Sequence, residues 1–104
     1  MLDKSLPASD SVVVIGLGRF GSAVARTLCT LGHDVLAIDS DAATVQQLAD
    51  DLPHLVQADA TDLEMLKQLD VGSYAHAVVS MGESLGSSVL TVLNLSQIGI
   101  KDIW

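Results

Sequence analysis

The feature that most constrains the fold is a run of β-branched residues that ends at a glycine. The run extends from Val12 to Ile15, and Gly16, Gly18 and Gly21 follow it in the pattern G-x-G-x-x-G. Four consecutive β-branched apolar residues suit a strand that is buried on both faces, as in the parallel sheet of an α/β domain. The glycine pattern is informative when a strand precedes it and a helix follows it. We therefore expect a strand, a tight turn and a helix.

This turn has the properties of a phosphate-binding loop. The first glycine permits the turn, the second lets a pyrophosphate approach the backbone, and the third lets the helix pack closely on the strand. Free N–H groups and the helix dipole then favour phosphate at the helix start. Asp39 closes the apolar segment 33–39, eighteen residues after Gly21, near the spacing of about 20 residues expected of a ribose-binding acid. The alternatives are an ordinary strand-to-helix turn for the glycines and a helix N-cap for Asp39.

Strands and helices alternate along the rest of the chain. We expect helices after the glycine turn, after Ser40 or Asp41, after Thr61 and over 87–98, where Thr61 and Glu64 would form a T-x-x-E capping box. We expect further strands at 55–58, 74–81 and 100–104, with a polar loop flanked by Gly82 and Gly86. This alternation predicts a Rossmann-like, doubly wound α/β fold with a parallel sheet of strand order 3-2-1-4-5.

Composition limits the domain organisation and the partners. A chain of 104 residues is one domain. We expect a disordered lead-in over 1–10 and a nucleotide-binding domain over 11–104. Because the sequence stops just inside the fifth predicted strand, we expect this domain to be a fragment. The formal net charge of -8 argues against nucleic acid or an anionic membrane as a direct partner. The single cysteine, Cys29, excludes an internal disulfide and favours a reducing compartment. No apolar segment approaches the roughly 20 residues of a membrane span.

In a parallel sheet of this order, ligands lie over the carboxyl ends of the strands. Four separate segments meet there, and they give the candidate nucleotide site: Gly16, Leu17, Gly18, Arg19, Phe20 and Gly21; Asp39 and Ser40; Asp59, Ala60 and Thr61; and Met81, Gly82 and Glu83. Arg19 is one of only five bases and is expected to contact a phosphate rather than only solvent. Asp59 either accepts from an adenine amino group or caps the next helix. Glu83 either meets a ligand or a metal or lies in a solvated loop.

These segments resemble a known family. The sequence Gly16-Leu17-Gly18-Arg19-Phe20-Gly21, with Asp39, Asp59-Ala60-Thr61 and Met81-Gly82-Glu83, is similar to the RCK or TrkA N-terminal nucleotide-binding domains, and most of all to their KtrA-type members. The resemblance covers residues 11–104. It implies a cytosolic regulatory subunit that forms a homodimer or ring on an integral-membrane potassium-translocating subunit and transmits nucleotide binding as a shape change. It favours ATP or ADP as the ligand. NAD(H) is the alternative, because ATP, ADP and NAD(H) all present adenosine and a pyrophosphate to the same loop.

Two other functions compete with this interpretation. The first is the cofactor-binding domain of an NAD-dependent oxidoreductase, but 104 residues supply no substrate domain. His33, His54 and His76 fall at the amino ends of predicted strands, away from the predicted site, so we expect no catalytic residue and no enzyme. The second is an interaction module with a vestigial glycine loop, against which Asp39 and Arg19 argue.

Overall fold

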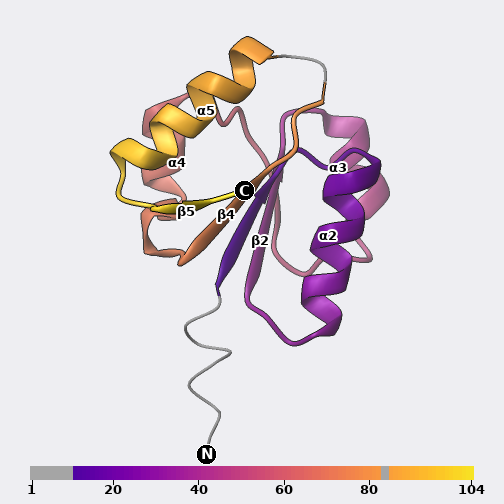
Figure 1. Cartoon of the computed structure of the whole chain (residues 1–104). Coiled ribbons are helices and arrows are strands. Elements are labelled where there is room, and N and C mark those ends of the chain that lie inside the picture. Colours follow the sequence, from indigo (N-terminus) through magenta and orange to yellow (C-terminus); the bar gives the residue numbers. More distant parts are fainter. Residues whose placement is uncertain (1–10, 83–84) are drawn as a thin grey trace, which may run out of the picture.

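The computed structural model describes residues 11–82 and 85–104, which form one parallel sheet flanked by helices (Figure 1). The predicted lead-in, 1–10, lies outside the described residues, as does Glu83. The strands are β1 (Val12–Ile15), β2 (Val35–Asp39), β3 (Leu55–Gln57), β4 (His76–Val79) and β5 (Asp102–Ile103). The helices are α2 (Arg19–Thr30), α3 (Ala42–Leu48), α4 (Leu63–Gln68), the short 3-10 helix η1 (Val71–Ser73) and α5 (Leu85–Gln97).

The sheet has the order β3-β2-β1-β4-β5, which confirms the predicted topology. In the centre, β1 pairs in parallel with β2 on one side, where Val12 lies opposite Val35, and with β4 on the other, where Val12 lies opposite His76. The strands are shorter than the sequence indicated, because β2 begins at Val35 and β4 covers only His76–Val79. This arrangement brings the carboxyl ends of β1, β2, β3 and β4 to one edge of the sheet.

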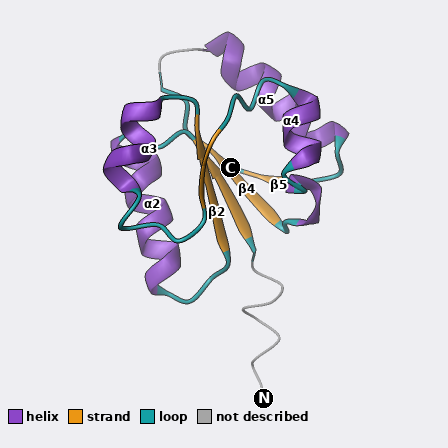
Figure 2. Ribbon diagram, turned by 180° about the vertical axis from the view of Figure 1, so that it is seen from behind, coloured by secondary structure: helices purple, strands orange, loops and turns teal. Residues whose placement is uncertain are grey.

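Helices cover both faces of the sheet (Figure 2), and each face packs on its own hydrophobic core. On one face Val13 and Ile15 of β1 belong to the core that contains Leu66 of α4 and Leu95 of α5. On the other face Val12 and Val14 belong to the core that contains Ala25 of α2 and Leu48 of α3. Successive side chains of a strand point to opposite faces, so an all-apolar β1 serves both cores. Fully burying each such side chain contributes about 1.5–3 kcal/mol, which makes β1 the centre of the fold.

The helix starts differ from the predictions at two places. The N-cap of α4 is Asp62, whose carboxylate accepts from the amides of Glu64 and Met65. The predicted capping box on Thr61 is therefore wrong, since the Thr61 hydroxyl donates to Asp59 instead. Helix α5 begins at Leu85, so Gly86 lies within the helix and does not end a loop.

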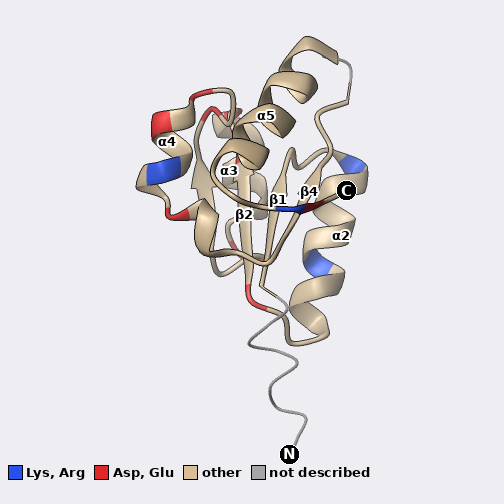
Figure 3. Cartoon of the chain, turned by 60° about the vertical axis from the view of Figure 1, so that its left-hand side comes forward, with Lys and Arg blue, Asp and Glu red and all other residues tan. Residues whose placement is uncertain are grey.

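Helix α5 has a buried face and an exposed face that carries large apolar side chains. Its residues Thr91, Asn94 and Leu95 are buried against the sheet, whereas Leu85 and Leu93 are 77% and 59% exposed. It carries no Lys, Arg, Asp or Glu, unlike α2 and α4 (Figure 3). No helix in the described ranges has the length and apolar character needed to cross a membrane.

Candidate functional site

The glycine turn joins β1 to α2, and two of its glycines are required by packing. Gly16 has φ +92°, and a Cβ atom there would lie 2.0 Å from the carbonyl oxygen of Ser80. A Cβ atom on Gly21 would lie 1.8 Å from the carbonyl oxygen of Gly16. Both distances are far below van der Waals contact, so these positions accept only glycine without movement of the backbone.

Gly18 differs from the other two glycines. Its φ of -68° is open to any residue, and a Cβ atom there would meet no heavy atom within 4 Å. The packing of the fold therefore does not demand glycine at this position. What glycine preserves is open space in front of the backbone, which is where a ligand could approach it closely.

The N-terminus of α2 differs from those of α3 and α4. Gly18 is its N-cap, no side chain caps it, and its first turn contains no acid. By contrast, Asp41 caps α3 and Asp62 caps α4 through their carboxylates. The first N–H groups of a helix have no partner within the helix, and together with the dipole they favour a bound phosphate or carboxylate. The start of α2 thus lacks the side-chain cap that α3 and α4 have.

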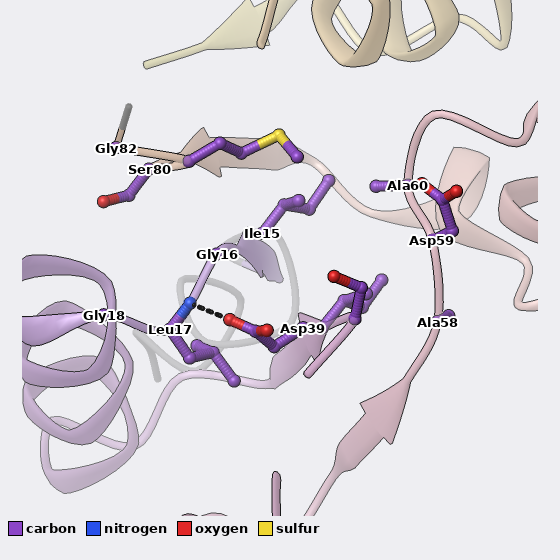
Figure 4. Close-up of a pocket in the computed structure, with 13 residues that line it drawn as sticks. Ile15, Gly16, Leu17, Gly18, Asp39, Ala58, Asp59, Ala60, Ser80 and Gly82 are labelled. Atoms are coloured by element: carbon purple, nitrogen blue, oxygen red, sulfur yellow. Dashed lines mark hydrogen bonds between the residues drawn. The ribbon is translucent and has the colours of Figure 1, made fainter. Parts of the chain in front are cut away.

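Asp39 ties the end of β2 to the glycine turn. Its Oδ2 accepts from the amide of Leu17 at 2.7 Å (Figure 4), and its Oδ1 accepts from the amide of Asp41 at 2.8 Å. Asp39 is therefore not the N-cap of α3, which is Asp41. Each carboxylate oxygen has two lone pairs, so acceptor capacity remains for ribose hydroxyls. The contact with Leu17 also fixes the direction of the carboxylate.

Asp59 forms a local turn at the end of β3. Its Oδ1 accepts from the amide of Thr61 at 2.9 Å and from the Thr61 hydroxyl at 2.6 Å. These two bonds hold the pKa of the Asp59 carboxyl below its ordinary value, because they favour the charged form. Asp59 does not cap α4, so that alternative is wrong. Its side chain is exposed and carries a negative charge at neutral pH.

These elements surround a cavity of about 410 Å³ above the carboxyl ends of the strands (Figure 4). Its volume lies within the range typical of small-molecule sites, roughly 300–1,000 Å³. The lining residues are Ile15, Gly16, Leu17, Gly18, Ile38, Asp39, Ser40, Ala58, Asp59, Ala60, Ser80, Met81 and Gly82. Figure 4 shows Gly18 and Leu17 on one side and Asp59 and Ala60 on the other.

The sequence predicted nine of these lining residues and missed Ile15, Ile38, Ala58 and Ser80. Each missed residue directly precedes a predicted one, so extending every predicted segment by one residue toward the strand would have found it. Of the other predicted residues, Arg19, Phe20, Gly21 and Thr61 do not line the cavity. Gly21 is buried under the turn, and Phe20 is 68% exposed on α2.

Arg19 is the first residue of α2, and its side chain is exposed. Over residues 11–82 and 85–104 the ion pairs are Arg26 with Asp51, Lys67 with Glu64, and His76 with Asp102, and Arg19 belongs to none of them. The histidines lie at the opposite end of the sheet, as His76 begins β4 and His33 and His54 precede β2 and β3. No group of three or more metal-binding side chains occurs in the described part of the chain.

The sequence profile of the TrkA-N domain matches residues 12–104. The chain belongs to the TrkA-N family. Two curated relatives from Bacillus subtilis strain 168 are the Ktr system potassium uptake protein C, which is 39% identical over 86% of this chain, and the Ktr system potassium uptake protein A, which is 37% identical over 88%. The chain spans only 41% of the length of each.

A solved structure has a fold similar to that of this TrkA-N domain. The NAD(P)-binding domain of an exopolyphosphatase-related protein from Archaeoglobus fulgidus superimposes with a TM-score of 0.79 at 23% identity, over 89% of this chain and 71% of that one. At this identity the likeness concerns the fold alone. It confirms that the TrkA-N domain described here is Rossmann-like.

Proposed function

We propose that this domain binds an adenine nucleotide in the cavity and thereby regulates a membrane potassium-translocating subunit from the cytoplasmic side. The proposal combines membership of the TrkA-N family with the names of the two Ktr relatives. Its mechanism is a ligand-dependent change of conformation, without catalysis.

The observation that carries the proposal is the combination of Gly18 and the uncapped start of α2. A glycine that packing does not require opens onto a cavity, and helix donors without a side-chain cap lie beside it. Phosphates are the groups that such a turn recognises. Asp39 then faces the ribose, and the Asp59–Ala60 side remains for the base. In this arrangement Ser40, Met81 and Gly82 complete the binding site, Arg19, Phe20 and Thr61 act around its edge, and Gly21 supports the turn from below. Glu83, which lies outside the described residues, stays a proposed site residue.

We propose ATP or ADP as the ligand, with NAD(H) as the second candidate. Arg19 supports the first choice, because it lies next to Gly18, is exposed and has no ion pair in the described ranges. A guanidinium there gains most from a terminal phosphate, which ATP has and NAD(H) lacks. Asp39 supports NAD(H) equally well, since both ligands have an adenosine ribose.

We further propose that two copies of the chain associate through the outer face of α5. Leu85, Val89 and Leu93 on that face are exposed, and residues 85–98 carry no charge. The chain as a whole has a net charge of -8, so an uncharged apolar face is where two copies can meet without repulsion. Sedimentation velocity over a concentration series should show a dimer that Leu93→Glu dissociates. A monomer at all concentrations would contradict this part of the proposal.

The test of the proposed ligand is calorimetric titration of the protein with ATP, ADP, NADH and NADPH. We expect micromolar or tighter binding of ATP and ADP, with a stoichiometry of one per chain. Stronger binding of NADH would identify the domain as a redox-state sensor. Failure of all four ligands to bind at millimolar concentration would contradict nucleotide binding.

A further inference from the structure

The buried face of α5 carries two polar side chains next to the cavity. Thr91 is fully buried and Asn94 is 6% exposed. Burying such groups is unfavourable unless they form hydrogen bonds. Their partners lie on other segments. The Asn94 Nδ2 donates to the carbonyl oxygen of Thr61 at 3.0 Å and of Ala60 at 3.4 Å, and the Thr91 hydroxyl lies 3.3 Å from the Met81 sulfur.

The contacts of Asn94 and Thr91 hold residues of the cavity wall or residues next to it. Ala60 and Met81 line the cavity, and Ala60 follows Asp59 in the turn after β3. Within that turn the hydrogen bonds between Asp59 and Thr61 are local, so they shape the turn without placing it against the rest of the molecule. Asn94 bonds the turn to α5. It is therefore positioned to determine how far this wall lies from the glycine turn.

The chemistry of the contact explains why an amide is used. The carbonyl oxygens of Ala60 and Thr61 both accept from Asn94 Nδ2, and an amide NH₂ group can supply two hydrogens from this one atom. A carboxylate of the same shape only accepts and would repel both oxygens. Leucine or alanine would leave the two carbonyls without this donor, which is costly in a buried place.

We propose that Asn94 is a positioning residue that fixes the Asp59–Ala60 wall for the nucleobase. This inference rests on the proposed function, in which the phosphates bind at Gly18 and the base lies at the far end of the cavity. Asn94 contacts the turn and is not among the described residues that line the cavity. Its loss should therefore weaken recognition of the adenosine part and leave recognition of the phosphates unchanged.

The test compares ATP with inorganic tripolyphosphate, which has the phosphates without the adenosine. Dissociation constants would be measured calorimetrically, or by displacement of a fluorescent ATP analogue, on wild type, Asn94→Ala and Asn94→Asp. We expect Asn94→Ala to weaken ATP about tenfold and to leave tripolyphosphate within twofold. Asn94→Asp should weaken ATP further; if this variant does not fold, Asn94→Ala alone decides. Ser96→Ala, on the exposed side of α5, is the matched control and should change neither ligand.

The outcomes separate this inference from the proposed function. If Asn94→Ala weakens ATP and tripolyphosphate alike, the residue only supports the general structure, and the inference is wrong. Unchanged ATP affinity in a folded Asn94→Ala protein would overturn it too. Wild type that binds ATP but not tripolyphosphate at millimolar concentration would overturn the division of the cavity. Wild type that binds no nucleotide would instead overturn the proposed function.

Discussion

Replacing Gly18 with valine separates ligand binding from folding. A Cβ atom at position 18 meets no heavy atom within 4 Å, and φ there is -68°, so the fold accommodates the change. Valine is a poorer N-cap than glycine, which costs about 1 kcal/mol or less. For a domain of this size, a full 1 kcal/mol would lower the melting temperature by roughly 4–8 °C, so the expected shift is no larger than that. Circular dichroism should show an otherwise unchanged protein.

The effect on the ligand should be much larger. The valine side chain would extend into the cavity at the place where a phosphate approaches the backbone. A phosphate held by two charge-assisted hydrogen bonds gains roughly 1.5–3 kcal/mol from each. Losing both corresponds to at least about a hundredfold weaker binding. We therefore expect calorimetric titration of Gly18→Val with ATP to give little or no heat at concentrations that saturate wild type.

Two control variants make this result specific. Gly86→Ala lies in α5, where a Cβ atom also meets nothing within 4 Å, so it should stabilise the helix by up to about 1 kcal/mol and leave ATP affinity unchanged. Gly16→Ala should disturb the fold, because its Cβ would overlap the Ser80 carbonyl. Normal ATP binding by a folded Gly18→Val protein would refute the assignment of the phosphate site.

Three further predictions follow from the side chains around the cavity. Arg19→Ala should weaken ATP about ten- to a hundredfold, ADP less and NADH little; an equal loss for all three in titrations would show that Arg19 supplies only general positive potential. Asp39 should repel a 2′-phosphate, so NADPH should bind at least about tenfold more weakly than NADH, and equal affinities by fluorescence titration would limit Asp39 to a structural role. Thr61→Val should raise the pKa of the Asp59 carboxyl toward its ordinary value, as measured by NMR titration. Because the folded pKa is depressed, the stabilisation from charged Asp59 is complete above the ordinary pKa and disappears as pH falls through the folded one, so Thr61→Val should destabilise at neutral pH but not in strong acid.

The topology could be predicted because two simple patterns determine it. Fully apolar short segments that alternate with helical spacing require a sheet covered on both faces, and the crossover rule then leaves few strand orders. The apolar run from Val12 to Ile15 predicted the position of the central strand, β1. In the structure Gly32 and Gly99 follow α2 and α5 with φ of +90° and +104°, the left-handed region that glycine favours just after a helix.

The helix starts were harder to predict, because neighbouring polar residues compete for the same amides. Thr61 and Asp62 are both good N-caps, and sequence spacing favoured Thr61. In the structure the Asp59 carboxylate accepts hydrogen bonds from the Thr61 hydroxyl and amide. Asp62 is then the residue that caps α4. The contacts of Asn94 were beyond sequence reasoning for a similar reason. Its carbonyl partners, Ala60 and Thr61, are more than 30 residues away.

The most direct test of nucleotide binding at this cavity is an amide NMR titration of the isotopically labelled chain with ATP. We predict saturable shifts that cluster at the amides of Gly16, Leu17, Gly18, Asp39 and Ala60, with the largest at the start of α2. Gly18→Val should abolish those shifts in an otherwise folded spectrum. Shifts that cluster elsewhere, such as on the surface formed by Lys67, Asp70 and Gln97, or no shifts at millimolar ATP and NADH, would contradict the proposed nucleotide site.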